Sequence, residues 1–144
     1  MEEGVAYARL DLEAGQMFVS LRRALGVTAI GMNQLLFEPG ERGRIHRHQH
    51  QEEVYLVLEG MLTLSVEGEE RDLAQGELAR VAPSVRRQLI NRGPGRLAIL
   101  ALGGMGEHNG RDAEAFTSWD DGDPKGPADV PFPARLPDGE LRQG

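Results

Sequence analysis

The residues best suited to chemistry lie in a short stretch near the middle of the chain. His46 and His48 are two residues apart, and Glu53 follows five residues after the second histidine. Imidazole nitrogens and carboxylate oxygens are common ligands of divalent metal ions. Histidine-rich loops also arise by chance, so the spacing alone is equally compatible with a solvated polar turn. A metal site is therefore one of two hypotheses that this stretch supports.

The geometry of β-strands indicates how the three side chains could meet. Alternate residues of a strand point to the same face, so the imidazoles of His46 and His48 can share one ion. Glu53 has the opposite parity and joins them only if a second strand starts after residues 49–52. Its side chain would then point inward together with Tyr55 and Val57. Such a site suits iron, manganese, nickel or zinc and leaves positions open for water or substrate.

Short strands and turns dominate the middle of the chain. Strands are predicted over residues 27–37, 54–58, 62–66, 78–81, 88–90 and 96–102. Turn residues recur roughly every ten residues, which favours an all-β sandwich or barrel. The run Val54–Leu58 is continuously apolar, so both faces of that strand should be covered. A two-fold dimer or the N-terminal segment folded over the sheet would cover it.

The two ends differ from the middle, and we expect three parts: an N-terminal segment (1–26), a barrel (27–103) and a C-terminal extension (104–144). Residues 17–25 could form a short helix ending at Gly26 or another strand. Residues 112–118 could form one helical turn. The tail from residue 120 contains five of the eight prolines, so it is either disordered or extended over the barrel. Trp119 and Phe132 are the residues expected to hold it.

Composition narrows the class of protein. A chain of 144 residues is long enough for one domain with its own core. The net charge of −7 disfavours nucleic acid as a partner, and the lack of cysteine excludes disulfides, thiolate catalysis and Cys-ligated zinc. No apolar run approaches membrane-spanning length, and the N-terminus is acidic where a signal peptide would be basic. We therefore expect a soluble, cytoplasmic protein.

Glycines bracket the histidines and the glutamate at regular spacing. The pattern runs Gly40, five residues, His46-x-His48, four residues, Glu53, six residues, Gly60. It resembles the first motif of the cupin family at every spacing. A second, more degenerate cupin-like motif keeps its spacing from Gly76 through Ala82-Pro83-Ser84 and Arg87 to Asn91. The resemblance covers roughly residues 27–102 and implies a small antiparallel jelly-roll barrel with a pocket between two sheets.

The second motif differs from the family pattern at one position that matters. Cupins usually supply a third histidine there as a further metal ligand, and this chain has Arg87. A guanidinium has no lone pair to donate, and about 5 Å from a dication it would be repelled by roughly 6–7 kcal/mol at an effective dielectric of ~20. Three protein ligands could hold the metal, or His50 could become a fourth. Alternatively, no metal binds and Arg87 pairs with Glu53.

Arg87 itself has three interpretations. It could neutralise Glu53 in a metal-free pocket, or it could hold the carboxylate or phosphate of an anionic ligand in a bidentate fork. It could also point to solvent beside Arg86, although strand alternation then requires a slip in register. Tyr55 is expected to line the pocket, an environment that core packing explains equally well. His108 is a lone histidine in a turn and is expected at the surface.

Two functions are the main hypotheses, and a structural protein with a vestigial pocket is a third. The first is a metal-dependent enzyme acting on a small, anionic molecule, by oxygenation at a two-histidine, one-carboxylate iron site or by metal-assisted isomerisation. The second is a non-catalytic module that binds or senses a small ligand, with or without metal. The missing third histidine favours the second function, whereas the retention of His46, His48 and Glu53 favours the first. In either case we expect a homodimer that binds neither nucleic acid nor membrane.

Overall fold

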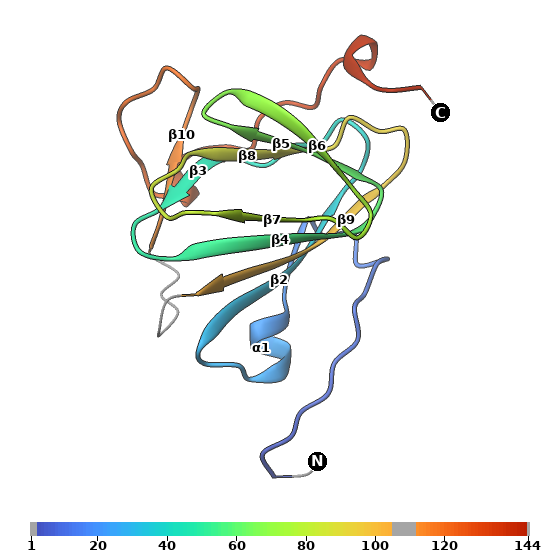
Figure 1. Cartoon of the computed structure of the whole chain (residues 1–144), viewed down its shortest axis with the longest axis vertical. Helices are drawn as coiled ribbons and strands as arrows, with labels where there is room; N and C mark the ends of the chain where they lie inside the picture. The colour runs from blue at the N-terminus through green and yellow to red at the C-terminus, as the bar shows by residue number, and fades with distance from the viewer. Residues whose placement is uncertain (1–2, 105–111, 144) are drawn as a thin grey trace.

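The chain folds into two packed antiparallel β-sheets (Figure 1). The computed structural model describes residues 3–104 and 112–143. Its strands are β1 (Phe18–Ser20), β2 (Ile30–Phe37), β3 (Ile45–His48), β4 (Glu52–Glu59), β5 (Met61–Val66), β6 (Glu69–Ala74), β7 (Leu78–Val81), β8 (Arg87–Ile90), β9 (Leu97–Gly104) and β10 (Ala113–Phe116). The helices are α1 (Leu21–Leu25) and the 3₁₀ turns η2 (Pro127–Asp129) and η3 (Asp138–Glu140).

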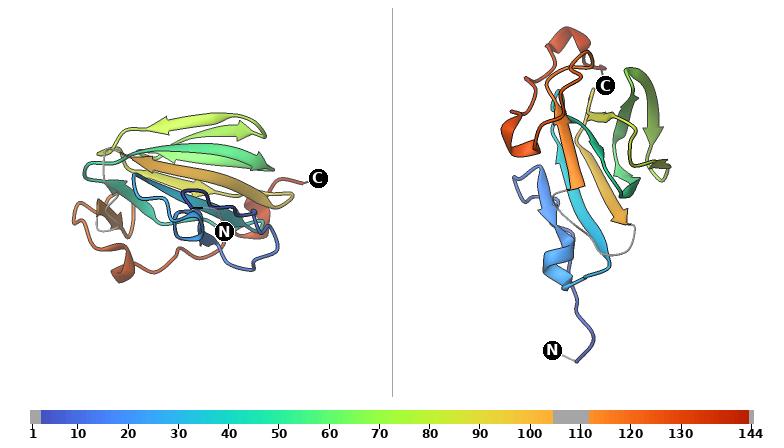
Figure 2. Two further views of the ribbon diagram at one scale, coloured as in Figure 1. Left: turned by 90° about the horizontal axis from the view of Figure 1, so that it is seen from below. Right: turned by 90° about the vertical axis from the view of Figure 1, so that its left-hand side faces the viewer.

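Each sheet contains five strands. The first has the order β1-β2-β9-β4-β7, and the second has the order β10-β3-β8-β5-β6. The two sheets lie face to face as separate layers, as the views in Figure 2 show. Strands that are neighbours in a sheet are mostly distant in sequence, as in a jelly roll. The predicted all-β jelly-roll fold is therefore confirmed.

The hydrophobic core lies between the two sheets. Alternate residues of β4 and β9 face inward, where Tyr55, Val57 and Ile99 are at most 1% exposed. Leu62 and Leu64 of β5 meet them from the second sheet. Period-2 alternation thus places one face of each strand in the core, as expected for paired sheets.

The break between β3 and β4 positions the candidate ligands. The chain leaves β3 after His48 and enters β4 at Glu52, and these two strands belong to different sheets. The predicted change of parity is confirmed, because Glu53, Tyr55 and Val57 all face inward. At the far end of β4, Gly60 has a φ of 84°, and a Cβ there would collide with the carbonyl oxygen of Arg96. Glycine is therefore required where the chain turns into β5.

The segment before the barrel contains both of the structures considered for residues 17–25. β1 pairs with β2, and α1 follows at once. The hydroxyl of Ser20 accepts a hydrogen bond from the backbone of Arg23, and Gly26 ends the helix in the left-handed conformation, as predicted. None of the helices in the described ranges has the length and hydropathy of a membrane-spanning segment.

The helical turn predicted within residues 112–118 is wrong, because residues 113–116 form strand β10. Alanine and glutamate favour helix, but pairing with the free edge of β3 overrides this local preference. The division into three parts stays a prediction; each flanking part contributes one strand to a sheet. His108 lies outside the described residues.

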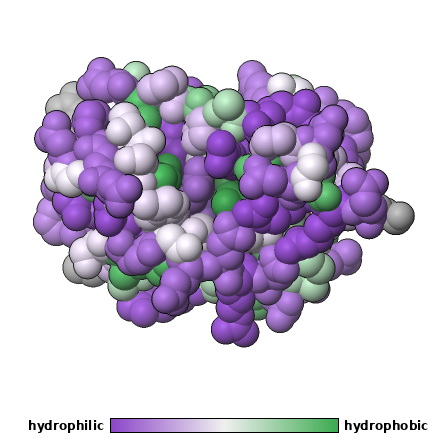
Figure 3. Space-filling view, turned by 90° about the horizontal axis from the view of Figure 1, so that it is seen from above, coloured by the Kyte–Doolittle hydropathy of each residue, from purple (hydrophilic) through white to green (hydrophobic). Residues whose placement is uncertain are grey.

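The C-terminal tail extends across the barrel (Figure 1). Val130 and Leu136 are its buried anchors, with 3% and 6% of their surface exposed. Phe132 stacks on Phe18 with ring centroids 6.0 Å apart, whereas Trp119 is only partly buried. The molecular surface seen from above is mostly hydrophilic, with small hydrophobic patches between polar side chains (Figure 3).

Candidate metal centre

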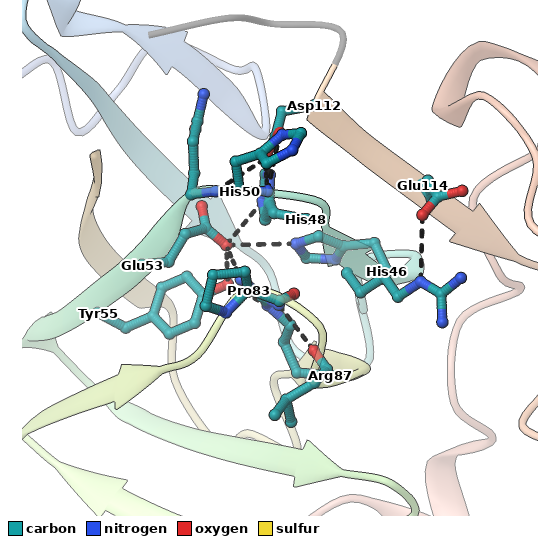
Figure 4. A network of polar contacts seen from close by, with 12 residues as sticks. His46, His48, His50, Glu53, Tyr55, Pro83, Arg87, Asp112 and Glu114 are labelled. Carbon is teal, nitrogen blue, oxygen red and sulfur yellow. Dashed lines mark hydrogen bonds and ion pairs between the residues drawn. The ribbon is translucent and has the colours of Figure 1, made fainter. Parts of the chain in front are cut away.

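His46, His48 and Glu53 converge between the two sheets (Figure 4). The histidines come from β3 and the glutamate from β4. The Nε2 atoms of His46 and His48 lie 3.4 Å and 3.1 Å from the same oxygen, Oε1 of Glu53. One potential ligand atom from each residue lies within 4.8 Å of the others. The structure thus brings the three predicted ligands to one point.

The other ring nitrogens face oxygen atoms. Nδ1 of His46 is 3.1 Å from the backbone carbonyl of Arg44, and Nδ1 of His48 is 3.5 Å from Oδ2 of Asp112. A carbonyl oxygen only accepts, so Nδ1 of His46 carries the hydrogen in that contact. Oxygen partners behind metal-binding histidines usually fix the tautomer in this way.

His48 supports the same conclusion from its burial. Both of its ring nitrogens are buried, and neither makes a well-formed hydrogen bond with the described residues. Buried polar atoms normally have a partner. A cation held by His48 together with Glu53 would supply one. The donor set therefore fits a divalent transition metal.

Asp112 is a functional residue that the sequence analysis missed. Its carboxylate accepts hydrogen bonds from the backbone N–H groups of His50 and Gln51, at 2.9 Å and 3.0 Å, besides facing Nδ1 of His48. Burial would raise the pKa of Asp112, but these hydrogen bonds outweigh it and lower the pKa. Asp112 lies 64 residues after His48, and no spacing rule could have connected the two.

His50 is not brought to the other two histidines. Its side chain is 76% exposed, and Nδ1 lies 3.0 Å from Oδ1 of Asp112. It does not line the cavity described below. The structure therefore places His50 on the outer side of Asp112 and leaves His46, His48 and Glu53 as the converging set.

Arg87 lies behind Glu53. It is fully buried, and its Nη2 is 2.8 Å from Oε1 of Glu53. Its Nη1 donates to the carbonyl of Val85 at 2.7 Å. In the register of β3 and β8, Arg87 is directly opposite His46, so the inward orientation expected from strand alternation is confirmed. The guanidinium pairs with Glu53 and does not face the cavity.

Tyr55 completes the contacts to Glu53. Its hydroxyl donates to Oε1 at 2.6 Å and accepts from Nε of Arg87 at 3.3 Å. All of these contacts are made to Oε1, and no hydrogen bond or ion pair among the described residues reaches Oε2 of Glu53. This second oxygen can therefore bind an ion while the pair with Arg87 stays intact.

The environment fixes the charge of these groups. Burial alone would raise the pKa of Glu53, but the interactions of its carboxylate with His46 and His48 outweigh this effect and hold that pKa well below its usual range. Burial, together with the charge of Glu53, raises the pKa of Tyr55 well above its usual range. At neutral pH Glu53 is therefore ionised and Tyr55 is protonated.

A cavity of about 290 Å³ opens beside these residues. His46, His48, Glu53 and Tyr55 form its polar end, and its remaining walls are mostly apolar. The other lining residues are Phe18, Asn33, Leu35, Phe37, Gly43, Arg44, Leu89, Ala101, Ala113 and Pro127. A few polar groups in an apolar cavity of this size are typical of a small-molecule site.

Comparisons with known proteins agree with this architecture. The family model described as "Cupin domain" matches residues 34–103. No curated protein matches the chain in sequence. A cupin protein from Bacteroides fragilis is structurally similar, with a TM-score of 0.62 at 21% identity over 71% of this chain and 85% of that one.

Two similar structures carry the name of an enzyme. A candidate sugar phosphate isomerase from Acidithiobacillus ferrooxidans has a TM-score of 0.59 at 26% identity over 68% of this chain and 63% of that one. A sugar phosphate isomerase of the cupin superfamily from Silicibacter pomeroyi has a TM-score of 0.60 at 27% identity over 70% of this chain and 64% of that one. This chain thus matches less than two thirds of the length of either protein. With the family match, the jelly roll and both spaced motifs in agreement, the chain belongs to the cupin superfamily.

Proposed function

We propose that this protein binds a divalent transition metal through His46, His48 and Glu53 and acts as a metal-dependent enzyme on a small, anionic molecule. The observation that carries the proposal is the convergence of both Nε2 atoms on one carboxylate, with an oxygen behind each histidine. Isomerisation is the favoured reaction class, because two similar structures are named for it.

The residues around the site have separate roles in this proposal. A bound metal ion would supply Lewis-acid polarisation of a substrate oxygen. Glu53 provides the negative charge, and the oxygens of Arg44 and Asp112 orient the two imidazoles. Tyr55 and Arg87 fix the glutamate from behind through Oε1. The apolar walls of the cavity exclude water from the bound molecule.

An activity assay tests the reaction class. Protein loaded with Mn²⁺, Fe²⁺, Ni²⁺ or Zn²⁺ is incubated with phosphorylated aldoses and ketoses of three to six carbons, and interconversion is followed by NMR. We expect turnover with at least one metal, its loss in Glu53→Gln, and its retention in His50→Ala, which changes a histidine outside the cavity. Metal binding without turnover of any sugar phosphate would contradict the isomerase assignment.

A second candidate function is supported by the pairing of Arg87 with Glu53. That ion pair neutralises the carboxylate without any metal, at an Nη2 to Oε1 distance of 2.8 Å. A metal-free cupin with this arrangement would bind or sense a small ligand without changing it. Ligand binding that is unaffected by complete removal of metal would favour this alternative.

We also propose a homodimer formed through the outer face of the β4 sheet. In the register of β4, β7 and β9, Leu56 lies between Leu78 and Leu100, and Val54 lies beside Leu102. Leu78 is 62% exposed, and the other four are only partly buried. Light scattering should give about twice the 15.8 kDa chain mass, and Leu56→Glu should shift it to the monomer value. A wild-type monomer would refute this proposal.

A further inference from the structure

The side chain of Arg44 is a cavity-lining cation that the proposed metal site does not use. Arg44 lies immediately before β3, two residues before His46, and both residues line the cavity. No carboxylate in the described part of the chain pairs with Arg44. Arg87 differs in both respects, because it pairs with Glu53 and does not reach the cavity.

The C-terminal tail holds the Arg44 guanidinium in place. Its Nε donates to the backbone carbonyl of Val130 at 2.5 Å, and its guanidinium carbon lies 3.8 Å from the centroid of the Phe132 ring. Phe132 is itself stacked on Phe18 at an interplanar angle of 21°. The edge with Nη1 and Nη2 has no acceptor among the described residues. A pre-oriented guanidinium with a free edge is suited to bidentate binding of a carboxylate or phosphate.

The electrostatics of the cavity point to the same ligand chemistry. Arg44 is partly buried, and no carboxylate in the described ranges forms an ion pair with it. The carboxylate of the lining, Glu53, pairs with Arg87 and not with Arg44. The positive charge of Arg44 therefore lacks a counter-charge, and an anionic group of a ligand would supply it.

We propose that Arg44 is the anion-recognition residue of this cavity and that the tail, through Val130 and Phe132, positions it. The ligand would carry a carboxylate or phosphate at Arg44 while the rest of it reaches toward His46 and His48. This inference rests on the proposed function for which end of the ligand reacts. The anion subsite itself does not require the metal. It also assigns a role to the tail.

Calorimetric titration with two simple anions, inorganic phosphate and malonate, tests the subsite. The full chain is used in metal-free and metal-loaded forms, and competition between the anions shows whether phosphate or carboxylate is preferred. We expect Arg44→Met to weaken binding of the preferred anion by about 10- to 100-fold in both forms. Arg44→Lys should restore part of the affinity, because it keeps the charge but loses the fork.

Arg47→Met is the matched control. Arg47 lies on β3, three residues after Arg44. It pairs with Glu114 at 3.2 Å and lies 5.2 Å from the centroid of the Phe116 ring. The Arg47→Met variant therefore loses one positive charge and one arginine–phenylalanine contact, as Arg44→Met does, but at a position that does not line the cavity. Equal affinities of the Arg44→Met and Arg47→Met proteins, or no binding of either anion to the wild type, would overturn the inference.

Two further variants separate the tail and the metal from the anion subsite. Phe132→Ala should weaken anion binding several-fold, and Phe132→Tyr should restore it, since the tyrosine ring can also stack on the guanidinium. Neither variant should change metal affinity. Anion binding that depends on Arg44 in a protein that takes up no metal would refute the metal proposal and leave this inference standing. Metal uptake together with anion binding that does not depend on Arg44 would refute this inference and leave the metal proposal standing.

Discussion

Replacing Arg87 by methionine is expected to lower the free energy of unfolding of the metal-free protein by about 3–5 kcal/mol, the usual range for breaking a buried ion pair. The substitution removes the cation at 2.8 Å from Oε1 of Glu53 and leaves the carboxylate with only Tyr55 and the two histidines around it. Methionine has a similar length, so the cost is mainly that of an unpaired buried charge. Urea denaturation followed by circular dichroism measures the change.

Two variants make this result specific to the buried charge. The double variant Glu53→Gln/Arg87→Met should recover most of the lost stability, because no unpaired charge remains. Arg80→Met breaks the pair between Arg80 and Glu52, which is shorter, at 2.6 Å, but has side chains 64% and 48% exposed. That variant should lose less than about 1 kcal/mol, since exposed pairs contribute little. Equal losses in Arg87→Met and Arg80→Met would contradict the role assigned to Arg87.

Replacing His46 or His48 by alanine is expected to weaken metal binding by more than about 100-fold. Loss of a direct ligand should exceed the 10- to 100-fold that is typical of groups behind the ligands. Asp112→Asn should fall in that intermediate range, because Asp112 only orients His48. Competition titrations with a chromogenic chelator and Zn²⁺ or Mn²⁺ give the affinities.

His50→Ala is the matched control for the two histidine ligands. It removes an imidazole two residues after His48, but the His50 side chain is 76% exposed and lies outside the cavity. Its metal affinity should stay within a few-fold of the wild type. A loss as large as that of His48→Ala would show that His50 is the fourth ligand, and would contradict the three-ligand site.

Much of the fold could be predicted from the sequence, because strand alternation and glycine positions are local signals. The parity change between His48 and Glu53 required two strands, and the structure places them in opposite sheets. The inward orientation of Arg87 followed from alternation with Leu89 and Asn91 in the same way. Local spacing was sufficient wherever the constraint came from the period of a strand.

The contributions of distant segments could not be predicted. Asp112, which faces His48, lies immediately before β10. The residues of β10 favour helix locally, and they form a strand because they pair with β3. Arg44 was overlooked because an arginine before a strand has no distinguishing pattern. Its significance depends on Val130 and Phe132, which lie more than eighty residues away in sequence. Such contacts are set by tertiary packing and leave no local period.

The metal content of untagged protein, purified without chelator, tests the central claim most directly. We predict about one divalent transition-metal ion per chain in the wild type and in His50→Ala, and almost none in His48→Ala and Glu53→Ala. Inductively coupled plasma mass spectrometry measures both the amount and the identity of the metal. Wild-type protein that is metal-free and cannot be loaded with Fe(II), Mn(II), Ni(II) or Zn(II) would contradict the claim and leave the Arg87–Glu53 pair as the resting state of a metal-free binding site.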